Sequence, residues 1–138
     1  MNRRVLFFII VPPIAFAYII VRFLPAHWDG VQIVGLILTV GGLILLTVSR
    51  IQLGNSFSLR PEARKLIKHG IYSRIRNPIY VFGAITITGL LLYLNRPLLL
   101  LLVLVIVPMQ IARARAEGRV LEERFGDEYR QYRSSTWF

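Results

Sequence analysis

The sequence predicts an all-α fold, an integral-membrane bundle of four transmembrane helices with a cytoplasmic amphipathic C-terminal helix. Hydrophobic residues make up 55% of the 138 residues. Four long runs carry no charge, which is too much apolar sequence for a soluble domain of this size. A charged segment with helical periodicity follows the last run. We expect residues 1–138 to form one membrane domain.

The four uncharged runs set the lengths of the spans. They are 17, 19, 19 and 16 residues long and cover residues 5–21, 31–49, 77–95 and 97–112. A bilayer core of about 30 Å takes roughly 20 helical residues, so the middle two runs suffice alone and the outer two need flanking residues. We therefore predict spans over about 5–24, 31–50, 77–95 and 97–112.

Small residues and turn residues indicate how these spans pack. The second run contains Gly35, Gly41 and Gly42, which let another helix approach closely, within one chain or between two. The oligomeric state therefore stays open. The turn signal Asn95–Pro97 alone separates the third and fourth runs, so we expect a tight antiparallel hairpin.

The last segment predicts an amphipathic helix over residues 113–133. Four apolar or aromatic residues are spaced at four, four and three, which places them on one helical face: Leu121, Phe125, Tyr129 and Tyr132. This helix can lie on membrane lipid with its arginines toward the phosphates. Alternatively, its apolar face can close over a site formed by the loop 51–76.

The basic residues predict the topology. The net charge is +10, and 15 of the 17 basic residues fall before the first run, in the loop 51–76 with Arg50, or after residue 112. Only Arg22 and Arg96 fall on the other side. The positive-inside rule then places both termini and the loop in the cytoplasm, in an inner or plasma membrane. Topology and anionic lipid account for the charge, and no separate basic patch with stacking aromatics indicates nucleic-acid binding.

Residue types that are rare or absent exclude several classes of chemistry. The chain has no cysteine, which excludes disulfides, a thiol nucleophile and cysteine-ligated metals. The two histidines, His27 and His69, stand 42 positions apart, so we expect no metal site. We assign no role to His27.

Two polar clusters are candidates for a functional site. The first is the segment His69–Tyr80, which supplies an imidazole, two tyrosines, two arginines and an asparagine where the third span begins. The second holds Arg113, Arg115 and Glu117, just beyond the fourth span. Since these spans form a hairpin, the start of one and the end of the other lie at the same membrane face. We therefore expect the clusters to meet.

The two clusters carry a resemblance. Ordered, spaced residues occur in two blocks: Gly70, Tyr72, Arg76, Asn77, Pro78 and Tyr80, then Glu117, Leu121, Phe125, Gly126, Tyr129 and Tyr132. This pattern resembles the superfamily of isoprenylcysteine carboxyl methyltransferases and phospholipid N-methyltransferases. The resemblance covers roughly residues 68–132. It departs at Asn77, where many members have histidine, and at Gly118, where a second glutamate is expected.

The resemblance implies methyl transfer from S-adenosylmethionine by an integral-membrane enzyme. It implies a cofactor pocket lined by Lys68, His69, Gly70, Tyr72, Arg76, Asn77, Pro78, Tyr80 and Glu117. Arg76, Tyr80 and Glu117 are the candidate catalytic residues. The acceptor would be a lipophilic or lipid-linked molecule that offers a carboxylate, an amine or a thiol.

The residue types suit this chemistry. Methyl transfer is an in-line displacement, so the protein mainly aligns the two reactants and excludes water, without a nucleophilic side chain of its own. The carboxylate of the cofactor, or of an acidic acceptor, is a natural partner for Arg76 or Arg74. Glu117 is the acid near the site that can take a proton from an amine acceptor.

Other interpretations of the same residues stay open. A non-enzymatic transporter or scaffold would want a charged residue at mid-membrane depth, and none of the four runs contains one. A membrane reductase that uses a nicotinamide cofactor would also place basic residues at a cytoplasmic pocket. Individually, Arg74 and Arg76 can be topology anchors, Tyr72 and Tyr80 can be interfacial belt residues, and Glu117 can pair with Arg113 four positions earlier.

Overall fold

The computed structural model describes residues 2–54 and 66–137. Within these residues all regular secondary structure is helical, which confirms the all-α class. The elements, in order, are α1 (Arg3–Arg22), α2 (Gly30–Leu53), η2 (Gly70–Ser73), α3 (Pro78–Tyr93), η3 (Pro97–Leu102), α4 (Val103–Phe125) and α5 (Asp127–Ser134), where η denotes a 3₁₀ helix.

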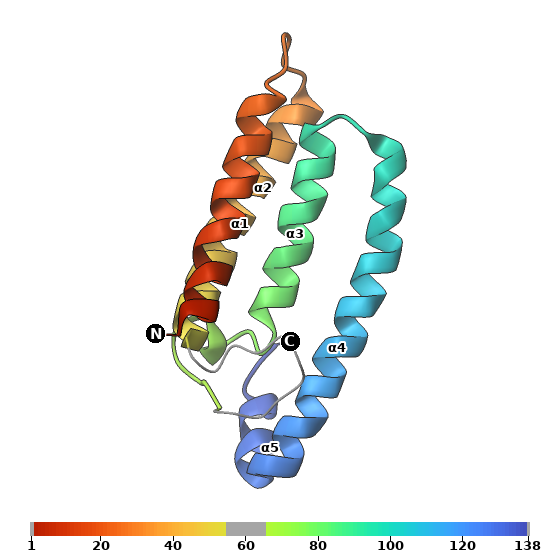
Figure 1. The fold of residues 1–138 in the computed structure, drawn as a ribbon. Coiled ribbons are helices and arrows are strands. Elements are labelled where there is room, and N and C mark those ends of the chain that lie inside the picture. The colour runs from red at the N-terminus through yellow and green to blue at the C-terminus, as the bar shows by residue number, and fades with distance from the viewer. Residues whose placement is uncertain (1, 55–65, 138) are drawn as a thin grey trace.

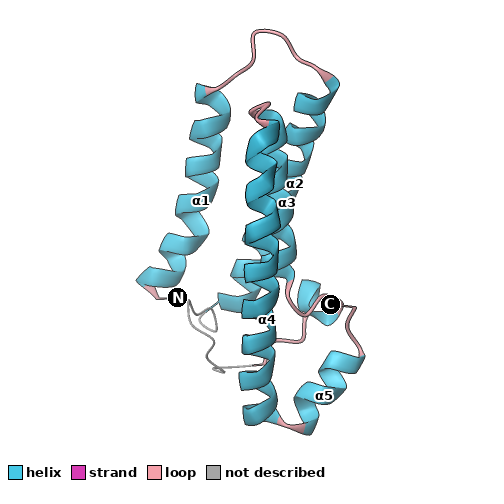
Figure 2. Cartoon of the chain, turned by 90° about the vertical axis from the view of Figure 1, so that its right-hand side faces the viewer, coloured by secondary structure: helices cyan, strands magenta, loops and turns pink. Residues whose placement is uncertain are grey.

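The helices alternate in direction. Figure 1 shows α1 and α3 running one way and α2 and α4 the other, so both chain ends, η2 and α5 lie at one end of the bundle. We call this the polar end. The ribbon of α1 is set apart from α2 in Figure 2, and that of α4 is set apart from α3 in Figure 1.

The core of the bundle is the seam between α2 and α3. Gly35 on α2 faces Gly89 on α3, where an added Cβ would lie 2.8 Å from the Gly35 carbonyl oxygen. Thr39 and Thr86 are completely buried beside them, and each hydroxyl donates to a carbonyl one turn earlier in its own helix. Small residues and internally satisfied hydroxyls let two backbones approach without leaving a polar group unpaired in an apolar environment.

Local signals account for the helix ends. The Gln32 backbone N–H donates to the Asp29 carboxylate at 2.7 Å, and the Asp29 backbone N–H donates to Oε1 of the Gln32 side chain. These two bonds form a capping box before α2. Pro78 occupies the first position of α3, where its missing N–H costs no helical hydrogen bond.

The third span differs from the length that the sequence predicts. Three helical segments are long and apolar enough to cross a membrane: Arg3–Arg22, Gly30–Leu53 and Pro97–Phe125. The helix α3 has 16 residues and is apolar, so it is shorter than the predicted span 77–95. The uncharged run includes Asn77 and Asn95, which lie outside the helix, and Asn95 takes a left-handed φ of 52°. Absence of charge does not separate a helix from its turns.

The C-terminal helix also needs correction. We predicted a separate helix over residues 113–133, but α4 continues unbroken from Val103 to Phe125. Gly126 then takes a φ of 56° and ends the helix, and α5 follows it. The change from apolar to charged sequence at residue 113 alters what surrounds the helix but not its backbone preference. The helix therefore ends at the glycine rather than at the change in polarity.

Candidate functional site

The expected meeting of the two clusters occurs between α3 and α4. The Tyr80 hydroxyl donates to Oε1 of Glu117 at 2.5 Å, and Nε of Arg113 donates to the same oxygen at 3.3 Å. The Glu117 side chain is 27% exposed. Its second oxygen, Oε2, makes no hydrogen bond with any described residue. A half-buried carboxylate thus keeps one oxygen available to a ligand.

The segment before α3 is attached to the end of α2. The backbone N–H of Ile71 donates to Oε1 of Gln52 at 2.9 Å. Gly70 has a φ of 59°, and an added Cβ would lie 2.5 Å from the Gln52 side chain. Two features therefore favour glycine at this position: the left-handed backbone conformation and the close contact with Gln52. This attachment positions the next residues, including Tyr72.

Tyr72 is buried at the centre of the polar end. Its carbonyl oxygen accepts the Tyr132 hydroxyl of α5 at 2.7 Å. Burial raises the pKa of the Tyr72 phenol, the nearby Tyr132, Glu117 and Tyr80 raise it further, and the positive charge of Arg50 opposes the rise. Tyr72 therefore stays protonated and acts as a hydrogen-bonding phenol.

The helix α5 covers this end of the bundle with two buried tyrosines. Burial raises the pKa of Tyr132 to about 12. Tyr129 is 3% exposed, and burial raises the pKa of its hydroxyl, while the positive charges of Arg76 and Arg133 oppose this. The Tyr129 hydroxyl makes no hydrogen bond within residues 2–54 and 66–137. It lies against Gly118, 2.8 Å from where a Cβ would stand.

This contact gives a physical reason for the departure at Gly118. A glutamate there would place its Cβ against a buried tyrosine that has no room to withdraw. The close approach of α5 to α4 thus favours glycine at this position. One buried phenol stands beside the position where the resemblance leads us to expect a second acid.

Arg76, Asn77 and Pro78 connect the covering helix to α3. Nη1 of Arg76 donates to the Arg133 carbonyl and to Oγ1 of Thr136, both at 3.3 Å. Asn77 precedes α3 and is half-buried, and its amide makes no hydrogen bond with a described residue. Pro78 is fully buried. Arg76 thus has a structural partner in the C-terminal segment, whereas Asn77 keeps its hydrogen-bonding capacity.

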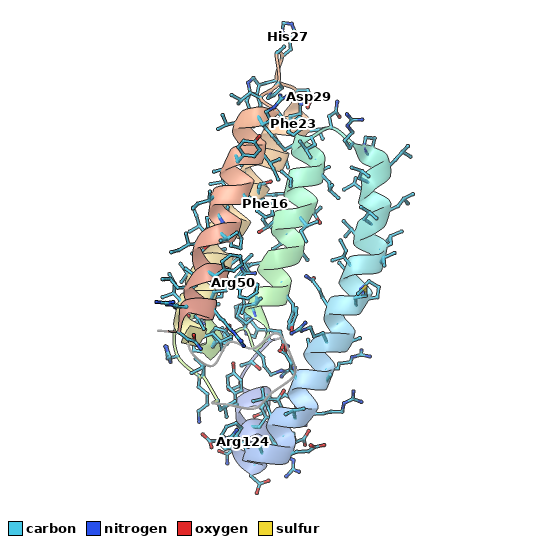
Figure 3. The ribbon with its side chains drawn as sticks, viewed as in Figure 1. Phe16, Phe23, His27, Asp29, Arg50 and Arg124 are labelled. Carbon is cyan, nitrogen blue, oxygen red and sulfur yellow. The ribbon has the colours of Figure 1, made fainter. Side chains whose placement is uncertain are left out.

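Two of the predicted residues lie on the outside. Lys68 is exposed and forms an ion pair with Glu128 at 3.0 Å. The His69 side chain is exposed, and its carbonyl accepts the Tyr72 N–H at 3.1 Å. The structure therefore brings Tyr72, Tyr80 and Glu117 together. It leaves Lys68 and His69 at the solvent-exposed edge of the polar end. His27 lies at the opposite end of the molecule (Figure 3).

Sequence reasoning missed two residues of the polar end, Arg50 and Gln52, and placed Tyr129 only on the amphipathic face and in the family motif. Arg50, labelled in Figure 3, is half-buried near Tyr72, and its Nη1 donates to the Phe8 carbonyl at 2.7 Å. Gln52 holds η2, and Tyr129 faces Gly118. In the sequence, Arg50 indicates only the topology. The available signal was its position, because the end of the second span shares a membrane face with the start of the third.

The described residues offer the charged and hydrogen-bonding groups that S-adenosylmethionine needs. The cofactor carries an ammonium, a carboxylate and ribose hydroxyls, which match a free carboxylate oxygen, a guanidinium and an unpaired amide. Glu117, Arg76 and Asn77 supply these groups. Among residues 2–54 and 66–137, no group of three or more histidine, aspartate or glutamate side chains is placed to hold a metal ion.

Comparison with known families identifies the family of this chain. The family model described as phospholipid methyltransferase matches residues 31–128, which is more than half of the chain. The chain belongs to the phospholipid methyltransferase family. The matched range starts in α2, ends in α5 and includes all of α3 and α4, so it contains every predicted site residue. The sequence resemblance to the superfamily is thereby confirmed.

The other two comparisons found no relative. No curated protein and no solved structure matches the chain. Family membership therefore rests on the sequence pattern.

Proposed function

We propose that this phospholipid methyltransferase family member transfers the methyl group of S-adenosylmethionine to a lipophilic or membrane-delivered acceptor at its polar end. The observation that carries the proposal is the Glu117 carboxylate. It is half-buried, Tyr80 and Arg113 hold it through one oxygen, and its other oxygen makes no hydrogen bond with the described residues. This group lies within the family match and joins α3 to α4.

Each residue of the site has a proposed role in holding the cofactor. S-adenosylmethionine, when bound, supplies an electrophilic methyl group on a sulfonium. Oε2 of Glu117 accepts a hydrogen bond from its ammonium or ribose, and the Arg76 guanidinium faces its carboxylate. The Asn77 amide and the Tyr72 phenol add neutral hydrogen bonds. Gly70 and Pro78 set the backbone around them, and Lys68 and His69 form the solvent-facing rim.

The acceptor determines whether the site must also remove a proton. A carboxylate or a thiolate attacks without losing one, so alignment and exclusion of water are sufficient. An amine must lose a proton, and Glu117 is the acid near the site that can take it. In both cases α5 and the bilayer limit access of water to the polar end.

We propose that the polar end faces the cytoplasm and that the whole chain is one membrane domain of an inner or plasma membrane. The asymmetry of the basic residues supports the orientation. A cytoplasmic site also gives a polar cofactor direct access from solution. The acceptor reaches the same site from within the membrane.

Calorimetric titration of the detergent-purified protein tests the proposal. S-adenosylmethionine and S-adenosylhomocysteine should bind saturably, whereas reduced nicotinamide dinucleotides should not. Binding of the nicotinamide cofactors alone would favour a reductase. Absence of all binding in folded protein would favour a scaffold or transporter and would contradict the proposal. Transfer of labelled methyl to lipid extracts and to a prenylcysteine analogue then identifies the acceptor.

A further inference from the structure

One polar side chain in the fourth span is not used by the proposed chemistry. Gln110 belongs to the uncharged run 97–112, and its amide faces Gly83 on α3, where an added Cβ would lie 3.5 Å from Nε2. In the part of the chain that the structure describes, this amide makes no hydrogen bond. An unpaired amide at membrane depth is costly, and polar groups retained there commonly face a substrate path.

The position of Gln110 relative to the site is set by the helix. Gln110, Arg113 and Glu117 are spaced at three and four residues, so they form one stripe on α4. Seven residues at a rise of 1.5 Å each place Gln110 about 10 Å from Glu117 along the axis, toward the membrane. Gln110 stands about one turn before Arg113, the first charged residue of α4. The first charge of a span marks the boundary between the hydrocarbon and the headgroups, so Gln110 lies close to this boundary on its hydrocarbon side.

The seam between α3 and α4 beside the amide is loosely packed. The absence of a side chain at Gly83 leaves the Gln110 amide facing a bare stretch of α3. Ala114 is the only buried residue of α4. The part of α4 that precedes Ala114 therefore packs loosely against α3. A lipid can therefore reach this seam laterally.

We propose that Gln110 recognises the acceptor by donating a hydrogen bond from Nε2 to a carbonyl oxygen about 10 Å from the atom that is methylated. The inference rests on the proposed function and specifies its acceptor. In an ethanolamine glycerophospholipid, ten covalent bonds of about 1.5 Å, bent at tetrahedral angles, join the headgroup nitrogen to an ester carbonyl oxygen and span about 12 Å. A prenylcysteine carries only hydrocarbon at this distance from its carboxylate.

The test compares two lipids that differ only at the carbonyl. The protein is reconstituted in phosphatidylglycerol vesicles with either diester or diether phosphatidylethanolamine, since the diether has no carbonyl oxygen. Wild-type protein should show a KM about tenfold lower for the diester, the factor expected for one hydrogen bond to a buried group. Gln110→Met, which is nearly isosteric, should remove this preference and leave the affinity for S-adenosylmethionine unchanged.

Met109→Leu is the matched control, because Met109 is the adjacent residue and is 66% exposed on the lipid-facing side of α4. It should retain the diester preference. Gly83→Leu should obstruct the seam between α3 and α4 and raise the KM for both lipids, which also tests the seam if Gln110→Met does not fold. Equal KM values for the two lipids in wild-type protein, or a diester preference that survives Gln110→Met, would overturn the inference.

A second readout keeps this test separate from the proposed function. Native mass spectrometry of protein released from the same vesicles measures bound lipid without any transfer. If wild-type protein fails to bind S-adenosylmethionine, the proposed function fails. The diester to diether ratio of bound lipid in wild type and Gln110→Met still decides whether Gln110 recognises a carbonyl.

Discussion

The two faces of α3 show opposite uses of glycine. Toward α2, Gly89 contacts Gly35 and the buried Thr39, and the two helices pack so closely that an added Cβ at Gly89 would overlap the backbone of α2. Toward α4, Gly83 meets the unpaired amide of Gln110. The contact of Gly35 with Gly89 closes one seam, whereas Gly83 faces a polar side chain across a more loosely packed one. The α2–α3 seam is thus the scaffold, and the α3–α4 seam carries the polar groups.

The largest effect is expected from breaking the closed seam. Gly35→Leu forces a side chain into the backbone of α3 and should lower the free energy of unfolding by at least about 3 kcal/mol, with loss of folded protein in detergent. Gly41→Leu is the control, because no atom lies within 4 Å of a Cβ there. Thermal unfolding and size-exclusion chromatography measure both. Equal stability of the two variants would contradict the closed seam.

The open seam should respond through ligand binding instead. Glu117→Ala should weaken S-adenosylmethionine binding by at least about tenfold, since a charged hydrogen bond is lost, while the protein folds normally. Tyr80→Phe should weaken it less, because the carboxylate remains. Arg96→Ala, at the opposite end of the bundle, should change neither property. Calorimetry measures the affinity of each variant for S-adenosylmethionine. Equal affinities in all three variants would contradict the site assignment.

A smaller effect is expected where α5 meets α4. Gly118→Ala should weaken the docking of α5 by about 1 kcal/mol, because the new Cβ meets the Tyr129 hydroxyl at 2.8 Å. The same substitution in a Tyr129→Phe background should cost almost nothing, because the nearest remaining atom is then the ring Cζ at 3.8 Å. Limited proteolysis of the C-terminal segment measures the four proteins. Additive effects in this double-mutant cycle would rule out the contact.

The last effect, confined to alkaline pH, is a pH dependence of the same covering helix. Folding raises the pKa of Tyr132 to about 12 from its ordinary value near 10. Its contribution to stability is therefore complete below about pH 10 and is lost as pH rises toward 12. Phenolate absorbance and proteolytic sensitivity of α5 should change together in this window. Tyr132→Phe, which also removes the bond to the Tyr72 carbonyl, should make the docking of α5 weaker and less dependent on pH here, and Tyr129, whose pKa burial also raises, should account for the rest.

Several features of the fold were readable from local chemistry. Uncharged runs marked the helices, and the turn at Asn95–Pro97 marked the hairpin that brings Tyr80 to Glu117. The true end of α4 was less readable, because both the predicted helix 113–133 and the observed α4 have helical periodicity. Gly126 decided the boundary through its positive φ, a signal present in the sequence but weaker than the change in polarity.

The sequence by itself determined the membrane class, the helical elements, the family pattern and the residues of the two clusters. These follow from composition, spacing and local backbone preference, which need no partner in space. Only the tertiary structure decided that Lys68 lies outside, that Tyr129 stands over Gly118 and that Gln110 faces Gly83. The reason is geometric: which side chain meets which depends on the rotation and separation of neighbouring helices, and those are set by packing between residues far apart in the chain.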